Sequence, residues 1–193
     1  MKITKEWLNK NNACLEGIEY CEEKRLIGLS ADIFADKLIN LKKWDWANWL
    51  VAHALGKIDK VRYVVFAAEA VLPIYEENYQ NDDRPRKAIE AAKTYIDNPC
   101  ADTARAARAA CAAATDAARA ARNADAARAA HAARAAHAAA YAATDADDYA
   151  ARVAAYAATD AADAANAARA ARATDAKYIE IIRYGIDLLK EDK

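Results

Sequence analysis

Histidine and aspartate are the residue types in this sequence that could hold a metal ion, and their spacing does not favour such a site. His131 and His137 are six residues apart, which places them about 120° apart around a helix. Asp145, Asp147 and Asp148 resemble a calcium-binding loop only loosely, because the glycine and the distal glutamate of such a loop are missing. A polar stripe and a helix-capping cluster account for these residues better. The sequence therefore predicts no metal ion and no cofactor.

The four cysteines form no recognisable redox, zinc or catalytic motif. Cys14 and Cys21 are seven residues apart, about 10 Å along a helix, whereas the Cα atoms of a disulfide lie within about 7 Å. Cys100 and Cys111 are even further apart on a second helix. We therefore expect four buried free thiols, as in a protein of a reducing compartment. Since no phosphate-binding glycine loop and no nucleophile elbow occurs, the chain is not expected to be an enzyme.

Six arginines in the alanine-rich part of the chain could contact the phosphates of a nucleic acid. They stand at positions 105, 108, 119, 122, 128 and 134. The segment that follows them is rich in aspartate, the net charge of the 193-residue chain is −1, and no aromatic residue is interleaved with the arginines. Nucleic-acid binding is therefore a remote alternative.

An unusual density of aromatic residues marks the segment 45–49, Asp-Trp-Ala-Asn-Trp. Trp46 and Trp49 are three residues apart and share one helix face with Leu50 and His53. Packing in the core is the first interpretation of this face. A recognition surface for a partner is the second, because tryptophan is enriched among the residues that dominate binding at protein interfaces.

A charged turn between helices is expected at 82–86, Asp-Asp-Arg-Pro-Arg. Helix capping and salt bridges within the chain are its first interpretation. In the second, Pro85 fixes the backbone of both arginines, which could then grip the carboxylates of an acidic partner. The candidate partner-binding residues are accordingly Asp82, Asp83, Arg84, Arg86, Trp46 and Trp49.

Helices must position these residues, because glycine and proline are scarce and no segment alternates as a strand does. Residues 1–98 are expected to form a helical region with a core of tryptophan, leucine and isoleucine. Helix starts are predicted at Thr4, Ser30, Asp45 and Pro85, and a kink or restart at Pro73. The helix expected at 31–43 should bury an apolar face that consists of Ile33, Phe34, Leu38 and Leu41.

Residues 99–193 are expected to form an alanine-rich helical region that packs against the first as one continuous domain. More than half of residues 101–176 are alanine, which lets helix backbones approach closely. Ala110 should face a neighbouring helix and Ala112 should lie on the polar stripe. Helix breaks are predicted near Asn123–Asp125 and at the aspartates of 145–148, with Thr174-Asp175 capping the last helix. Arginine outnumbers aspartate in 101–143 and the reverse holds in 144–176, so antiparallel packing of these segments would pair opposite charges.

The fold class predicted is therefore all-α, a multi-helix bundle or short helical array whose C-terminal half is closely packed. The sequence starts without the apolar run of a signal peptide and holds no stretch as long as a transmembrane helix. We expect a cytoplasmic protein with no membrane partner.

Several segments carry a family resemblance, and they are spread over most of the chain. They are Trp7-Leu8 followed by Ala13-Cys14, Asp45-Trp46-Ala47-Asn48-Trp49, Phe66-Ala67-Ala68-Glu69-Ala70-Val71, and the run from Asp82 to Ala92. With the long alanine tract and the closing amphipathic helix, they resemble a family of phage and bacterial immunity proteins. This family is grouped with the fifth class of polymorphic-toxin immunity proteins.

The resemblance implies an intracellular protein that is not an enzyme and that neutralises a toxin by binding it, or that blocks a host defence protein in a phage setting. The leading hypothesis is therefore a protein-binding inhibitor of the immunity type. A helical scaffold without an inhibitory role is the alternative from another class, and a toxin gene or virion structural genes beside this one would distinguish the two.

Overall fold

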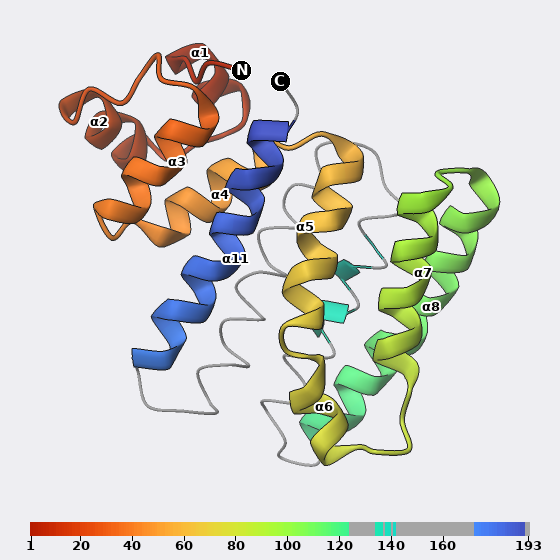
Figure 1. Ribbon diagram of the computed structural model, residues 1–193. Coiled ribbons are helices and arrows are strands. Elements are labelled where there is room, and N and C mark those ends of the chain that lie inside the picture. Colours follow the sequence, from red (N-terminus) through yellow and green to blue (C-terminus); the bar gives the residue numbers. More distant parts are fainter. Residues whose placement is uncertain (124–133, 137, 140, 142–171, 192–193) are drawn as a thin grey trace.

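The computed structural model describes residues 1–123, 134–136, 138–139, 141 and 172–191, and its described elements are helices (Figure 1). This confirms the all-α prediction. In chain order the helices are α1 (Lys5–Lys10), α2 (Leu15–Glu23), α3 (Ala31–Asn40), α4 (Trp44–Ala54), α5 (Lys57–Glu69), α6 (Leu72–Asn78), α7 (Arg84–Asp97), α8 (Ala101–Asn123) and α11 (Arg172–Glu191).

Local signals set most of the helix starts. The Thr4 side chain accepts a hydrogen bond from the backbone N–H of Trp7 and so caps α1. Pro73 and Pro85 lie in the first turns of α6 and α7, where a missing N–H leaves no helical hydrogen bond unmade. Pro73 therefore restarts the helix after α5. Ser30 occupies the N-cap of α3 as predicted, although its side chain makes no capping hydrogen bond.

Two predicted helix starts are wrong by a few residues. The N-cap of α4 is Lys43, and Asp45 lies within the first turn. The cause is the tight end of α3, where Lys42 adopts a positive φ of 58° and the N–H of Lys43 bonds to the carbonyl of Leu38, so that α4 begins at once. Thr174-Asp175 lies inside α11, which already begins at Arg172.

The buried face of α3 also differs from the prediction. Phe34 and Leu38 are buried as expected, but Ile33 is 48% exposed and Leu41, the C-cap residue, is 38% exposed. The face that packs inward is completed instead by Ala31, Ala35 and Ile39. Contacts of α3 with α4 and α11 lie on the face that carries these residues, and such long-range contacts are not visible in the sequence of α3 alone.

The closing helix α11 packs against α3, α4 and α5, and Figure 1 shows it between α3–α4 and α5. Gly185 permits the closest approach. A Cβ atom built at Gly185 would lie 2.4 Å from Cγ1 of Val51 in α4 and 2.8 Å from Cε2 of Tyr63 in α5. Position 185 therefore requires glycine, because a side chain there would collide with Val51 and Tyr63. Tyr63 is itself fully buried and donates a 2.8 Å hydrogen bond to Asn48.

The alanine-rich helix α8 packs against α7, which in turn packs against α5. Ala107, Ala114 and Ala117 are fully buried, Ala110 is partly buried and Ala112 is exposed, so the predicted faces of α8 are confirmed. The break expected near Asn123–Asp125 falls at the edge of the described residues. The aspartate break at 145–148 and the antiparallel pairing of 101–143 with 144–176 lie outside them.

Candidate functional site

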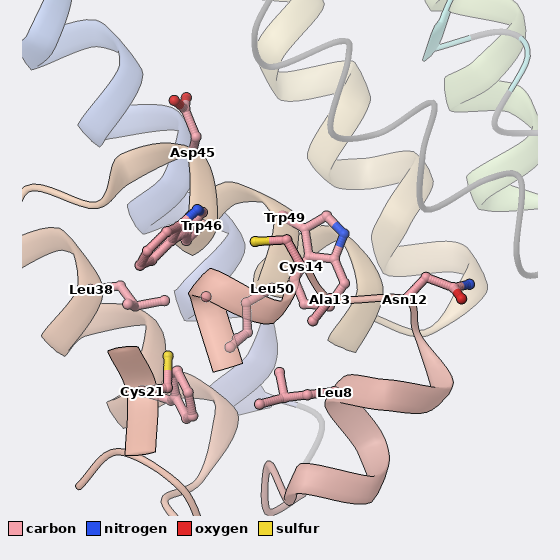
Figure 2. A pocket seen from close by; sticks show the side chains of 12 residues that line it. Leu8, Asn12, Ala13, Cys14, Cys21, Leu38, Asp45, Trp46, Trp49 and Leu50 are labelled. Atoms are coloured by element: carbon pink, nitrogen blue, oxygen red, sulfur yellow. The ribbon is translucent and has the colours of Figure 1, made fainter. Parts of the chain in front are cut away.

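A pocket of about 320 Å³ opens where α1, α2, α3 and α4 meet. The helices contribute side chains at helical spacings of three or four residues, such as Phe34 and Leu38 of α3, or Trp46, Trp49 and Leu50 of α4. The connection between α1 and α2 closes one side. The complete lining is Leu8, Asn12, Ala13, Cys14, Gly17, Cys21, Phe34, Leu38, Asp45, Trp46, Trp49 and Leu50 (Figure 2).

The floor of this pocket is apolar and its rim is polar. Leu8, Cys21, Phe34, Leu38 and Leu50 are all at least 95% buried. By contrast, the rim residues Asn12, Cys14 and Asp45 are exposed, and the two tryptophans are partly buried between floor and rim. An apolar hollow with a few polar groups at its mouth is the usual chemistry of a binding site.

Ring contacts hold both tryptophans in place. Trp49 meets Trp7 edge-on with ring centroids 6.0 Å apart and stacks on His53 at 4.3 Å. Trp46 meets Tyr20 edge-on at 5.3 Å. These contacts make the tryptophans rigid walls rather than mobile surface side chains.

A lysine adds to the support of one wall. The ammonium group of Lys43 lies 4.4 Å from the ring centroid of Trp46 and 4.9 Å from that of Tyr20. At these distances the cation is attracted by both ring faces. The Lys43 ammonium group therefore packs on the aromatic wall, and Lys43 is not among the residues that line the pocket.

The two thiols of the pocket differ in accessibility. Cys14 is the N-cap residue of α2 and is exposed, whereas Cys21 is buried, and burial raises the pKa of the Cys21 thiol to about 11. Cys100 and Cys111 form a similar pair, since Cys100 precedes α8 and is exposed while Cys111 is buried. The prediction of four buried thiols is therefore wrong for Cys14 and Cys100, because each stands just outside a helix and not on its packed face.

A carboxylate marks the rim of the pocket. Oδ1 of Asp45 accepts a 3.0 Å hydrogen bond from the phenol of Tyr178, which is 7% exposed and belongs to α11. This bond fixes the carboxylate from the side of the closing helix. Its remaining lone pairs can serve a ligand.

The charged turn at 82–86 is an internally paired structure. Nε of Arg84 donates a 2.8 Å hydrogen bond to Oδ1 of Asp82, and a second guanidinium nitrogen bonds to Oδ2. The buried phenol of Tyr75 also donates to Asp82, at 2.6 Å. The hydrogen bonds from Arg84 hold the pKa of the Asp82 carboxyl down to about 2, and burial together with this carboxylate raises the pKa of Tyr75.

The other charges of the turn have partners as well. Arg86 forms two 2.7 Å hydrogen bonds with the carboxylate of Glu76 in α6, and Lys87 pairs with Asp83 at 2.8 Å. Salt bridging within the chain is thus what the turn shows, whereas Asp83, the N-cap residue of α7, makes no capping hydrogen bond with its side chain. A partner carboxylate would have to displace one of these internal pairs.

The structure brings Trp46 and Trp49 together at one pocket and leaves the turn elsewhere. Figure 1 shows α1–α4 on one side of the molecule and the connection between α6 and α7 on the opposite side. The other lining residues were not predicted as site residues. The sequence signals nearest to them are the segment 45–49, which contains Asp45, and the pairs Trp7-Leu8 and Ala13-Cys14, which carry the family resemblance.

Metal-ligating side chains do not cluster in the described part of the chain. Among those residues, no group of three or more histidine, cysteine, aspartate or glutamate side chains could hold a metal ion. His131, His137 and the aspartates at 145, 147 and 148 lie outside it. None of the helices described is both long and apolar enough to cross a membrane.

Comparison with known protein families gives a match over most of the chain. The family model described as Imm-5 like putative immunity protein matches residues 53–179. No curated protein and no solved structure matches the chain significantly. The matched range includes the charged turn and Tyr178, whereas every residue that lines the pocket precedes it.

Proposed function

The chain belongs to the Imm-5 like putative immunity protein family, and from this membership we propose that it neutralises a toxin or a defence protein by binding it directly. The match over residues 53–179 is the observation that carries the proposal. It agrees with the family resemblance of the sequence, which rests partly on residues outside the matched range.

Direct binding without catalysis is the proposed mode of action. Among the described residues that line the pocket, the ionisable groups are two thiols and one carboxylate. These residues include no imidazole or amine that could activate a thiol. The arginines of the charged turn are paired with carboxylates of the chain itself. These arrangements suit recognition better than bond-breaking chemistry.

We place the action of the protein in the cytoplasm. All four cysteines are free, and two of them are exposed. Exposed free thiols suit a reducing compartment, since an oxidising one favours disulfides.

Of the two surfaces predicted to contact the partner, we favour the one formed by Trp46 and Trp49. Both rings are partly exposed at a hollow and held by neighbouring rings, as in the anchors that dominate protein interfaces. Asp82, Asp83, Arg84 and Arg86 are the second surface, and contact with a partner there would compete with their internal pairs.

A stoichiometry measurement tests the function. Proteins captured from the native host on the immobilised chain are identified by mass spectrometry, and the activity of each purified candidate is titrated with the protein. Neutralisation by direct binding requires inhibition that saturates at a fixed molar ratio. Inhibition by an amount of the protein far below that molar ratio would indicate an enzyme instead. Capture of structural assembly proteins, with no activity inhibited, would favour the scaffold.

A further inference from the structure

We propose that the pocket between α1, α2, α3 and α4 receives one large apolar side chain of the protein partner, with a cationic group of that partner beside it against Asp45. This inference rests on the proposed function and adds to it the chemistry of the contact. The pocket lies outside the residues that match the family, so family membership does not assign it.

The size and lining of the pocket select an apolar side chain. A hollow of about 320 Å³ is at the small end of the range for ligand sites, which run from about 300 to 1,000 Å³. Its floor offers Leu8, Leu38 and Leu50, and its walls offer two indole rings. Figure 2 shows these side chains around one space. An aromatic or long aliphatic anchor therefore matches both its volume and its surface.

The charge at the rim selects a cation beside that anchor. Asp45 is the single charged residue among those that line the pocket in the described structure. Asp45 is exposed, its carboxylate accepts from Tyr178, and Figure 2 shows this carboxylate pointing away from the apolar floor. The nearby ammonium group of Lys43 lies against the rings of Trp46 and Tyr20. A lysine or arginine of the partner would complement this carboxylate.

The pocket is preformed, so an inserted anchor would not have to reorder its walls. The contacts of Trp49 with Trp7 and His53, and of Trp46 with Tyr20, fix both walls before any ligand arrives. Little side-chain freedom is then lost on docking. A rigid hollow with a surrounding surface is the arrangement in which one inserted side chain contributes most of the binding energy of an interface.

Three small probes test the chemistry on the purified full chain. Phenethylamine carries a ring and a cation, 3-phenylpropionate carries the same ring and an anion, and methylamine carries the cation without a large apolar group. Binding is followed by NMR through the indole N–H signals of Trp46 and Trp49. We expect phenethylamine to shift both signals and to bind at least about fivefold more tightly than either of the other probes. Equal binding of the three probes would overturn the inference.

Two variants and one control make the test specific. Gly17→Leu places a side chain in the pocket, since a Cβ there already lies 3.0 Å from Sγ of Cys14 and 3.9 Å from Cε2 of Trp46. It also replaces glycine within a helix, which favours folding. Asp45→Asn keeps an acceptor for Tyr178 and removes the charge. We expect Gly17→Leu to abolish binding of phenethylamine and Asp45→Asn to erase its advantage over 3-phenylpropionate. Glu19→Leu, on an exposed position of the same helix, should bind as the wild type does.

The partner identified by capture then decides between a protein and a small molecule as the occupant. Its Kd should rise more than about tenfold for Gly17→Leu and at least about threefold for Asp45→Asn, with Glu19→Leu within about twofold. An unchanged Kd for both pocket variants, with neutralisation intact, would overturn this inference and leave the proposed function standing. Probe binding with an unchanged partner Kd would show a small-molecule site, and it too would overturn the inference. If the wild-type protein neutralises none of the captured proteins, that result contradicts both the proposed function and the proposal that a protein side chain occupies the pocket. Asp45→Asn decides the matter if Gly17→Leu does not fold.

Discussion

Tyr178 donates a 3.0 Å hydrogen bond to the carboxylate of Asp45, although the two residues are 133 positions apart in the chain. The bond joins the closing helix α11 to the first turn of α4, which also carries Trp46. The rim of the pocket is therefore braced by the last helix of the fold. Residues from inside and outside the family-matched range meet at this point.

Removal of this bond should weaken the fold moderately. Tyr178→Phe keeps the buried ring and deletes the donor, so we expect the free energy of unfolding to fall by about 1 kcal/mol, the usual net value of a hydrogen bond. Urea denaturation followed by circular dichroism measures it. Asp45→Asn, which can still accept from Tyr178, should cost less. An unchanged midpoint for Tyr178→Phe would mean that the bond contributes nothing to stability.

The Asp82–Arg84 pair should make part of the stability depend on pH. Hydrogen bonds from Arg84 hold the pKa of Asp82 at about 2, below its ordinary value of 3.8. A carboxyl with a lowered pKa in the folded state stabilises the fold above its unfolded pKa, and this contribution is lost as the pH falls through the folded value. We expect the wild type to be more stable than Asp82→Asn by about 1–2 kcal/mol near pH 6, after allowance for solvent screening of the partly exposed Arg84.

The same pair of proteins provides the check. Chemical denaturation at a series of pH values should show the difference in unfolding free energy shrinking between about pH 4 and pH 2, where Asp82 becomes protonated. A difference that stays constant over this window would show that the Asp82 carboxyl titrates normally.

Close packing of α8 should make it intolerant of larger side chains on one face only. Ala114 is fully buried and Ala112 is exposed on the same helix. Ala114→Leu should overpack the contact surface and cost about 1–3 kcal/mol, whereas Ala112→Leu should stay within about 0.5 kcal/mol of the wild type. Thermal melts compare the two variants directly. Equal destabilisation would mean that the face of α8 is wrongly assigned.

The four thiols should react in two classes. Cys14 and Cys100 are exposed, while Cys21 and Cys111 are buried and their pKa values are raised to about 11 by burial. Since the thiolate is the reactive form, a thiol-specific reagent near pH 8 should label Cys14 and Cys100 rapidly and the other two only after unfolding. Peptide mapping of the labelled protein identifies the sites. Rapid labelling of Cys21 would contradict the packing of the pocket floor.

Features that depend on a few neighbouring residues were predictable from the sequence. Thr4 caps α1 and Pro85 starts α7 because such signals act within one helical turn. The pairing of Arg84 with Asp82 is equally local. Arg86 instead pairs with Glu76, ten positions away across the turn, a partner that becomes visible only once α6 and α7 are placed.

Features that depend on packing between distant helices were not predictable. Ile33 is as apolar as Phe34, yet it is 48% exposed, because α4 and α11 lie on the other face of α3. The tryptophans of the pocket stood out by their type and spacing. Its floor did not, since Leu8, Cys21 and Leu38 come from three helices whose meeting point is a tertiary property.

Among the residues of the charged turn, Arg86 distinguishes most cleanly between the two surfaces proposed for the partner. Its pair with Glu76 is solvent-exposed, with 51% of the arginine side chain accessible, and such pairs contribute little to stability. Arg86→Ala should therefore leave the melting temperature unchanged to within a few degrees. Arg84 is less suitable, because Arg84→Ala would remove the guanidinium from the Asp82 carboxylate, which would keep only its hydrogen bond from Tyr75, and should destabilise the protein by about 1–3 kcal/mol.

With the partner that capture identifies, isothermal titration calorimetry should give a Kd for Arg86→Ala within about twofold of the wild type, because the favoured surface lies at Trp46 and Trp49. Trp46→Ala, measured beside it, should raise the Kd more than about tenfold, or by about 1.4 kcal/mol. The reverse result, tight binding by Trp46→Ala and a tenfold loss for a fully folded Arg86→Ala, would move the partner to the charged turn. Glu76 would then compete with the partner's carboxylate for Arg86. The variant Glu76→Gln should therefore bind that partner more tightly than the wild type.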